Sequence, residues 1–428
     1  MPSNSVPLPP SGRFVEAVRE TSRKARENAN ITVSPEAINR FLFSPAFTQT
    51  FSRLRTAHGM ALPLNFPSVL AELNLLSILS LLNFASGYRV PLHTATGRGA
   101  FDTIRAFVFS MYISAEVEGD HLSAEGMKSL DEGKVARLMG VEGQIHTERP
   151  HESIPGVQVG ELGGPLWEVV QLVTKVMKET GEVLVKGGYP NLGAFVLEAL
   201  KDGEKARTAQ GDTPGTGYPE CEVILEKLVR AIPAFQDMAM VDGEPVYCFK
   251  KALLTMHAIT LRFSSANPSS FPLPRTTNLP IFSDNVIPSL LVHLGVIDLS
   301  TSKRSLGLRD IFPDASKKEI LEALLGPPTN QKEATDQQKK DKPVPKEGPI
   351  LKTEQAFALR AAAIDACELI VKAAREMSDE EIKAHGDGLE WIKNITLPEL
   401  DAWIWAVAKD RMDYRRLERF VLRETVYF

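Results

Sequence analysis

Residues 356–376 read AFALRAAAIDACELIVKAARE, and this stretch decides the fold class. Its apolar residues recur at intervals of three and four, at Ala356, Leu359, Ala363, Ala366, Ile370 and Ala373. Charged residues occupy the other faces, so the spacing predicts an amphipathic helix. Similar spacing recurs in residues 167–177, 223–232 and 249–260. Alternation with a period of two is scarce, so we predict a mainly α fold with a few short strands.

The composition excludes several classes of protein. The 428 residues include 49 lysines and arginines against 54 aspartates and glutamates, which gives a formal charge of −5. This balance argues against a dedicated nucleic-acid-binding protein, because such proteins carry a concentrated basic surface. The three cysteines form no CxxC pair and the eight histidines no HExxH motif, so we predict neither a metal site nor a disulfide.

Three polar segments suggest how the chain is organised. Residues 326–349 are rich in proline, glutamine and lysine, and this composition predicts a disordered insertion. Residues 201–219 are rich in glycine, threonine and aspartate and are predicted to form a surface loop. Residues 1–13 contain four prolines and are predicted to be a disordered tail, which leaves residues 14–428 as one large helical domain.

No segment has the features of an export signal or a membrane span. Residues 1–13 lack the apolar run of a signal peptide. The most apolar stretch, residues 69–84, contains Glu72 and Asn74 and is shorter than the roughly 20 residues that a span requires. We therefore expect a cytoplasmic protein that does not contact a membrane.

Residues 279–288, LPIFSDNVIP, place one carboxylate and one amide in an apolar stretch. A carboxylate in such surroundings is partly desolvated, as catalytic acids, bases and cation-stabilising groups often are. An alternative interpretation is that Asp284 or Asn285 caps the following helix, with Pro288 in its first turn. Capping is the commoner use of aspartate at this position, and both interpretations are open.

Two further charged features precede this stretch in the sequence. Lys250 and Lys251 open an apolar helix, where their charge opposes the helix dipole. They either extend to solvent or reach an acidic group or a phosphate. Asp237 follows the end of another predicted helix and is a third candidate.

Taken together, these segments resemble the queuosine salvage proteins, which are queuosine 5′-phosphate N-glycosylases. Asn83-Phe84 is similar to the family's Leu-Asn-Phe, Phe235-Gln236-Asp237 to its Phe-Arg-Asp, and Lys250-Lys251-Ala252 to its Lys-Arg-Ala-Gln. The most specific match is Phe282-Ser283-Asp284-Asn285-Val286-Ile287-Pro288, which resembles the family's Phe-Ala-Asp-Tyr-Arg-Val-Pro. Residues 359–361 and 400–405 resemble two later family segments. Asn285 and Val286 stand where the family has tyrosine and arginine.

The resemblance implies a single domain similar to helical DNA glycosylases, with no cofactor. It implies hydrolysis of the bond between ribose and queuine in queuosine 5′-monophosphate, with queuosine as a second possible substrate. The released queuine would serve transfer RNA modification. Two alternatives are open: a nucleotide-binding protein without hydrolysis, and a DNA base-excision glycosylase, which the acidic charge disfavours.

The resemblance also assigns roles to residues. Asp284 matches the catalytic aspartate, and Lys250 would pair with Asp284 or with the 5′-phosphate. The remaining expected substrate-binding residues are Asp237 at the polar edge of the base, Phe282, Phe84 or Phe249 stacked on it, and Asn83, Asn285 and Lys251. Because a 7-deazapurine lacks N7, we expect catalysis to depend on stabilisation of an oxocarbenium-like cation by a carboxylate in a dry pocket. The sequence does not indicate an oligomeric state.

Overall fold

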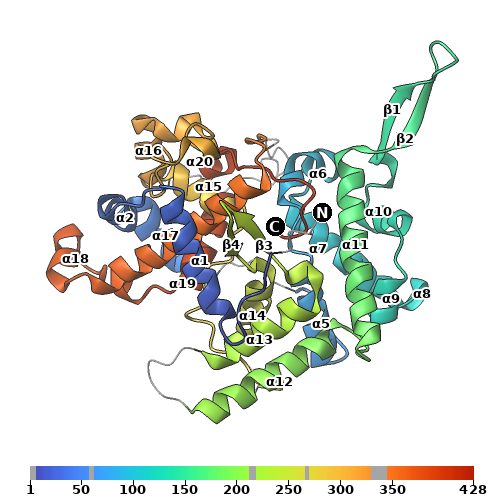
Figure 1. The fold of residues 1–428 in the computed structure, drawn as a ribbon, viewed down its shortest axis with the longest axis horizontal. Coiled ribbons are helices and arrows are strands. Elements are labelled where there is room, and N and C mark those ends of the chain that lie inside the picture. The colour runs from blue at the N-terminus through green and yellow to red at the C-terminus, as the bar shows by residue number, and fades with distance from the viewer. Residues whose placement is uncertain (1–5, 57–61, 212–217, 266–268, 329–344) are drawn as a thin grey trace. The chain divides into compact units, whose positions relative to one another are not determined.

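The computed structural model describes residues 6–56, 62–211, 218–265, 269–328 and 345–428 (Figure 1). It is 61% helical and only 6% strand, which confirms the predicted mainly α class. The described residues form two compact units. Unit 1 draws on residues 1–62, 237–253 and 275–421, and unit 2 on residues 63–236, 254–274 and 422–428. The chain passes between the units several times, and the likeness to helical DNA glycosylases stays a prediction.

Unit 1 contains most of the C-terminal helices and one hairpin. Its α-helices and strands are α1 (Phe14–Asn28), α2 (Pro35–Leu42), α3 (Pro45–Thr48), α4 (Phe51–Leu54), β3 (Met238–Val241), β4 (Glu244–Tyr247), α15 (Val286–His293), α16 (Lys318–Leu325), α17 (Thr353–Glu376), α18 (Asp379–His385), α19 (Leu397–Asp410) and α20 (Met412–Arg416). Short 3₁₀ turns lie at η4 (Arg304–Leu306), η5 (Pro313–Ser316) and η6 (Glu390–Asn394). The helix α14 (Lys250–Phe263) begins in this unit and continues in unit 2.

The core of unit 1 forms around α17, the helix that the opening stretch predicts. Its apolar face is buried from Ala356 to Ala374, and α1 packs along it. Two arginines of α1 also pair with α17, where Arg26 contacts Asp365 and Arg19 contacts Glu368 at 2.7 Å. The first and last parts of the chain are therefore joined by both apolar and ionic contacts.

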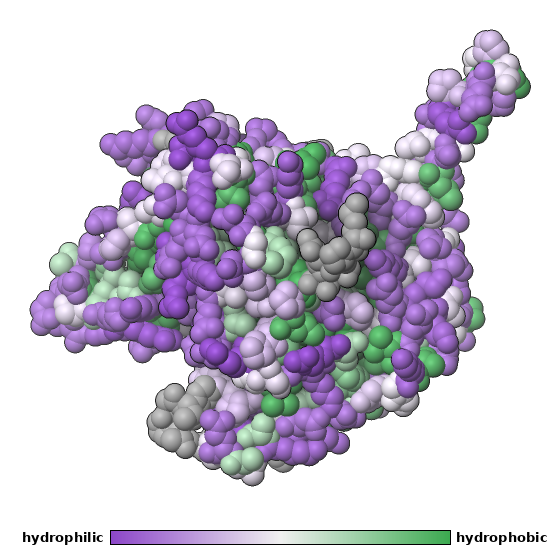
Figure 2. Space-filling model, in the orientation of Figure 1, coloured by the Kyte–Doolittle hydropathy of each residue, from purple (hydrophilic) through white to green (hydrophobic). Residues whose placement is uncertain are grey.

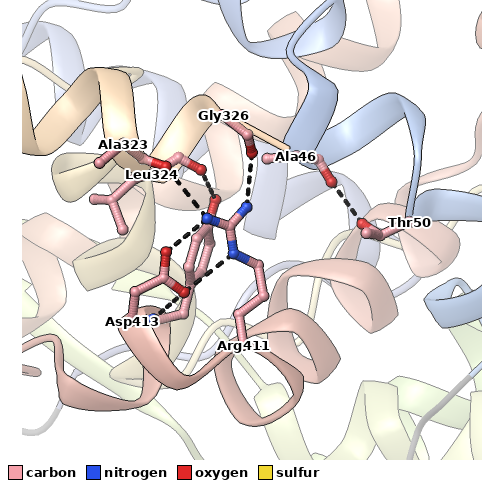
Figure 3. A network of polar contacts seen from close by, with 8 residues as sticks. Ala46, Thr50, Ala323, Leu324, Gly326, Arg411 and Asp413 are labelled. Atoms are coloured by element: carbon pink, nitrogen blue, oxygen red, sulfur yellow. Dashed lines mark hydrogen bonds and ion pairs between the residues drawn. The ribbon is translucent and has the colours of Figure 1, made fainter. Parts of the chain in front are cut away.

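The end of α16 is held by Arg411, which lies between α19 and α20 (Figure 3). Its guanidinium donates to the carbonyl of Gly326 at 2.9 Å and that of Ala323 at 3.3 Å. It also pairs with Asp413, at 3.1 Å through Nε and 2.6 Å through Nη2. An arginine at a helix C-terminus donates hydrogen bonds to carbonyls that lack a partner within the helix, and its positive charge interacts favourably with the negative end of the helix dipole.

Unit 2 is also mainly helical. Its α-helices and strands are α5 (Val69–Leu81), α6 (Arg89–Thr96), α7 (Ala100–Ile113), α8 (Ala115–Glu118), α9 (Ala124–Lys128), α10 (Glu132–Met139), β1 (His146–Pro150), β2 (Gln158–Leu162), α11 (Gly164–Lys186), α12 (Leu192–Gln210) and α13 (Pro219–Ala231). The 3₁₀ turns are η1 (Ser86–Tyr88), η2 (Glu142–Gln144) and η3 (Pro233–Phe235). The predicted segments 167–177, 223–232 and 249–260 lie largely within α11, α13 and α14.

The β1–β2 hairpin stands away from α10 and α11, which flank it in sequence (Figures 1 and 2). The strands are antiparallel with His146 opposite Leu162. Their residues are almost all exposed, including the apolar Leu162, and Ile154 and Val157 are exposed at the tip. The surface of the hairpin is accordingly a mixture of hydrophilic and hydrophobic side chains (Figure 2).

Two of the expected irregular segments need correction. The tail predicted over residues 1–13 is wrong for residues 6–13, because Pro9 is buried and the Pro7 carbonyl accepts a 2.7 Å hydrogen bond from the Tyr247 hydroxyl. The loop predicted over residues 201–219 is wrong for residues 201–210, which continue α12. Good helix formers fill this stretch, and its buried Gly203 lets α13 approach closely.

The remaining parts of these segments lie largely outside the described residues. These are residues 1–5, residues 212–217 and residues 329–344 of the predicted insertion at 326–349. Residues 345–349 are described and form neither helix nor strand. Among the described helices, none alone is long and apolar enough to cross a membrane, although the bent pair Val69–Leu81 and Ser86–Thr96 passes that test together.

Candidate active site

A group of charged side chains is buried in unit 1. Asp237, Lys251 and Arg360 are 0% exposed, Lys250 is 4%, Asp401 5% and Asp284 6%. Charges removed from water are costly unless they are paired or hydrogen-bonded, and such groups concentrate at functional sites. These six residues define the candidate active site, and the contacts below show how the fold holds them.

The β3–β4 hairpin places Asp237 beside the start of α14. Asp237 precedes β3 and Lys250 follows β4, and antiparallel pairing of Met238 with Tyr247 brings them together. The Asp237 carbonyl accepts hydrogen bonds from the amides of Cys248 and Phe249, at 3.0 and 3.2 Å. Its Oδ2 accepts from the Lys250 amide at 3.0 Å, so the carboxylate satisfies a donor of the first turn of α14.

Phe249 turns the chain into α14 with a backbone φ of 45°. This left-handed conformation is strained for a phenylalanine and persists only where the surroundings enforce it. Its ring is fully buried and stacks on Phe14 and Tyr247, with ring centroids 5.9 and 5.5 Å away. These contacts favour a packing role for Phe249 over the predicted stacking on a base.

Arg360 of α17 connects the Asp237 segment with the segment that carries Asp284. Its Nη1 and Nη2 donate to Oδ1 and Oδ2 of Asp237 at 2.7 and 2.6 Å. Its Nε donates to the Ser283 carbonyl at 2.9 Å, and the Ser283 hydroxyl donates to the Arg360 carbonyl at 3.1 Å. Burial lowers the pKa of Arg360, but the charge of Asp237 outweighs this and leaves that pKa raised. The guanidinium is therefore always charged, and the bidentate pair is of the strong kind.

Asp284 caps α15, as one of the two open interpretations predicts. Its Oδ1 accepts from the amides of Val286 and Ile287, at 2.7 and 3.3 Å. Its Oδ2 accepts no hydrogen bond from any of the described residues, so capping uses only one of the two oxygens. A capping role and a chemical role are thus compatible in the same side chain.

Asn285 is the N-cap residue of α15, but its side chain makes no capping hydrogen bond. Its Nδ2 donates to the Phe420 carbonyl at 2.8 Å, and the side chain is 2% exposed. Its Oδ1 is buried and has no hydrogen-bond partner among the described residues. A buried amide oxygen without a donor is costly and is available to a ligand donor.

Asp401 of α19 reaches the same segment. Its Oδ2 accepts from the Phe282 amide at 2.7 Å. Burial raises the pKa of Asp401 to about 8, and the charge of Asp284 adds to the rise, while the Phe282 amide and Lys250 oppose it. Burial lowers the pKa of Lys250 to about 8, although Asp284 favours its charged form. Burial and the neighbouring Lys250 lower the pKa of Lys251 well below the normal value.

The structure brings most of the predicted residues together in unit 1. Asp237, Lys250, Lys251, Phe282, Asp284 and Asn285 all belong to it. Asp237 has both carboxylate oxygens bonded to Arg360 and no exposure, which favours a positioning role over the predicted contact with the base. Asn83 and Phe84 lie in unit 2, just after α5, and their substrate-binding role stays a prediction.

Sequence reasoning did not select Arg360 and Asp401 as site residues, although both lie in segments that resemble the family. The signal was present, since each is an ionisable residue within an otherwise apolar helical stretch. Such a residue is rarely buried unless it is paired. Among the described residues, no three histidines, cysteines, aspartates or glutamates are grouped so that they could hold a metal ion.

Residues 216–321 match the family model described as queuosine salvage protein. The match supports the resemblance to the queuosine salvage family. It spans the segments with Asp237, Lys250 and Asp284, the ones that also carry the most specific resemblance to the queuosine salvage family. The chain matches no curated protein sequence.

Proposed function

We propose that this protein hydrolyses the N-glycosidic bond of queuosine 5′-monophosphate and releases queuine. The observation that carries the proposal is the state of Asp284. This buried carboxyl has one oxygen held by two helix amides and the other without a hydrogen bond among the described residues. It lies within the part of the chain that matches the queuosine salvage family.

The proposed reaction passes through an oxocarbenium-like state, in which positive charge develops at the anomeric carbon of ribose. A fixed carboxylate in a site shielded from water stabilises that charge without reorganising during the reaction. Oδ1 of Asp284 is fixed by the amides of Val286 and Ile287, and Oδ2 is left to face the cation or a water molecule. Asp284 therefore stabilises the cation and receives the proton of the attacking water.

Lys250 is a positive side chain that interacts electrostatically with this carboxylate in the proposed site. Its pKa is lowered to about 8 by burial, and Asp284 is the group that most favours its charge. The protonated amine balances the Asp284 carboxylate and, in the proposed complex, pairs with the substrate phosphate. In the reaction, Lys250 binds and orients the nucleotide while Asp284 acts on the bond.

The test is mass-spectrometric detection of free queuine after the purified protein is mixed with queuosine 5′-monophosphate. Asp284→Asn keeps an oxygen that can accept from the Val286 amide but removes the charge. We expect it to lower the rate on the order of 10²–10³-fold. Asp298→Asn is the matched control, since Asp298 also accepts from an amide two residues ahead, that of Ser300 at 2.8 Å, but at the surface.

Unchanged activity of Asp298→Asn beside a slow Asp284→Asn supports the proposal. An equal loss of queuine release in the two variants contradicts the proposal. Unchanged queuine release by Asp284→Asn contradicts it as well. If the wild-type protein releases no queuine but is stabilised against heat by the nucleotide, it is a binding protein and the proposed hydrolysis is wrong. The unpartnered amide oxygen of Asn285 is the observation that favours this second function, because it offers a ligand contact without chemistry.

A further inference from the structure

The candidate active site contains a second buried carboxyl besides Asp284. Asp401 is 5% exposed, and only its Oδ2 is hydrogen-bonded among the described residues, to the Phe282 amide at 2.7 Å. Phe282 precedes Asp284 by two residues, so their Cα atoms are at most about 7 Å apart. Both carboxyls therefore accept hydrogen bonds from backbone amides of the same short segment, and the charge of Asp284 acts on Asp401.

The surroundings of these two carboxyls differ. Two amides donate to one oxygen of Asp284 at the start of a helix, which suits a carboxylate. Asp401 receives one amide, and burial together with the Asp284 charge raises its pKa to about 8. A carboxyl in that state carries its proton at neutral pH. A carboxyl that keeps its proton beside a second carboxyl in different surroundings is the usual pattern of an acid and its partner.

The other charged and titratable groups around Asp401 agree with this division. Lys250 of α14 opposes the rise in the pKa of Asp401, but burial and Asp284 outweigh it. Cys367 of α17 is fully buried, and burial raises its pKa far above the normal value, so the thiol is neutral and adds no charge. Burial and the charge of Asp284 therefore retain the proton of Asp401, against the opposing charge of Lys250.

We propose that Asp401 is the catalytic acid of this site and donates its carboxyl proton to the leaving base. The inference rests on the proposed function. The bond between the anomeric carbon and the base nitrogen breaks, and the bonding electrons leave with the base, which takes the proton of Asp401. Water forms the new bond to the anomeric carbon, and its proton passes to Asp284. Exchange with solvent then returns a proton to Asp401 and removes one from Asp284.

The decisive comparison is between two leaving groups. Queuine leaves as a strongly basic nitrogen anion unless it is protonated, whereas the nitrophenolate of 4-nitrophenyl β-D-ribofuranoside 5′-phosphate leaves without a proton. Asp401→Asn keeps an oxygen for the Phe282 amide but has no acidic proton. We expect it to slow queuine release on the order of 10²–10⁴-fold, while nitrophenol release falls less than about tenfold.

Two further variants complete the design. Asp284→Asn is expected to slow both substrates alike, because cation stabilisation serves either leaving group. Asp401→Glu restores a proton on a slightly longer side chain, so we expect it to recover part of the queuine release that Asp401→Asn loses. This comparison uses only queuosine 5′-monophosphate and holds even if the nitrophenyl compound binds poorly.

The outcomes separate the two proposals. If Asp401→Asn slows the hydrolysis of both substrates equally and Asp401→Glu recovers none of it, Asp401 only holds the Phe282 segment. This result overturns its role as the acid. An unimpaired Asp401→Asn overturns that role as well, while the proposed hydrolysis stands. A wild-type protein that releases no queuine overturns both.

Discussion

Two arginine–aspartate pairs of unit 1 are both bidentate, but their aspartates differ in exposure. Arg360 and Asp237 are both 0% exposed and lie 123 residues apart in sequence. Arg411 is 5% exposed, but its partner Asp413 is 42% exposed and only two residues away (Figure 3). The first pair joins distant segments of the candidate active site, whereas the second closes the end of one helix.

The difference shows what decides the importance of an ion pair. When one partner of an exposed pair is removed, water solvates the other at little cost. When one partner of a buried pair is removed, the remaining charge has no compensation. The Arg360–Asp237 pair also holds the Lys250 amide and the Ser283 carbonyl, so its loss would disturb the proposed chemistry as well as the fold.

The largest effect is expected for Arg360→Met. It leaves Asp237 buried without its cation, and we expect a loss of about 3–5 kcal/mol in the free energy of unfolding. Queuine release should fall by at least about 10²-fold, since a displacement of 1 Å at catalytic groups has that effect. Denaturant unfolding and the mass-spectrometric assay measure the two losses separately.

A double variant sharpens this prediction. Arg360→Met with Asp237→Leu removes both charges, so much of the stability should return, as it does when buried pairs are replaced by apolar residues. Activity should stay low, because nothing then holds the Lys250 amide or the Ser283 carbonyl. Activity that recovers with stability would show that the pair only supports the fold.

A smaller effect is expected for Asp401, a buried carboxyl with no arginine. Because its pKa is raised, the folded protein retains this proton between about pH 4 and pH 8, where the unfolded chain has already lost it. Stability of the wild type therefore falls with rising pH relative to Asp401→Asn, on the order of 2 kcal/mol between pH 5 and pH 7. Lys250 titrates in both proteins, so its contribution largely cancels from the difference.

Thermal unfolding of the two proteins at several pH values tests this expectation. The melting temperature of Asp401→Asn should rise relative to the wild type as the pH increases through this window. The exposed Asp310→Asn serves as control and should follow the wild type throughout. A constant difference between Asp401→Asn and the wild type would mean that Asp401 is ionised in the folded protein at these pH values.

The smallest effect is expected for Arg411→Met. It removes the hydrogen bonds to Gly326 and Ala323, but Asp413 remains in contact with water, so we expect a loss of about 1 kcal/mol. Queuine release should match that of the wild type. A loss of stability as large as that of Arg360→Met would contradict the view that burial separates the two pairs.

Periodicity and local chemistry predicted much of this molecule. The spacing in residues 356–376 predicts α17, and Asp284 before Pro288 predicts a capped α15, because both depend on neighbours along the chain. The error at residues 201–210 arose because a polar composition suits an exposed helix as well as a loop. A charged residue in an apolar helix indicates a special position for Arg360. Its partner Asp237 lies 123 residues away in the sequence, so only the tertiary fold brings the two together. For the same reason, the protonation of Asp401 depends on Asp284 and Lys250, which no local pattern connects to it.

The pairing of α1 with α17 has a consequence for biosynthesis. Arg26 and Asp365 are 339 residues apart, so at about 5–20 residues per second α1 leaves the ribosome roughly 20–70 s before its partner is made. During this interval Phe14, Val15 and Val18, buried in the finished protein, have no α17 to cover them. The nascent chain therefore leaves the apolar face of this amphipathic segment uncovered for most of its synthesis, and we expect chaperones that bind such segments to determine how much of the protein reaches its folded form.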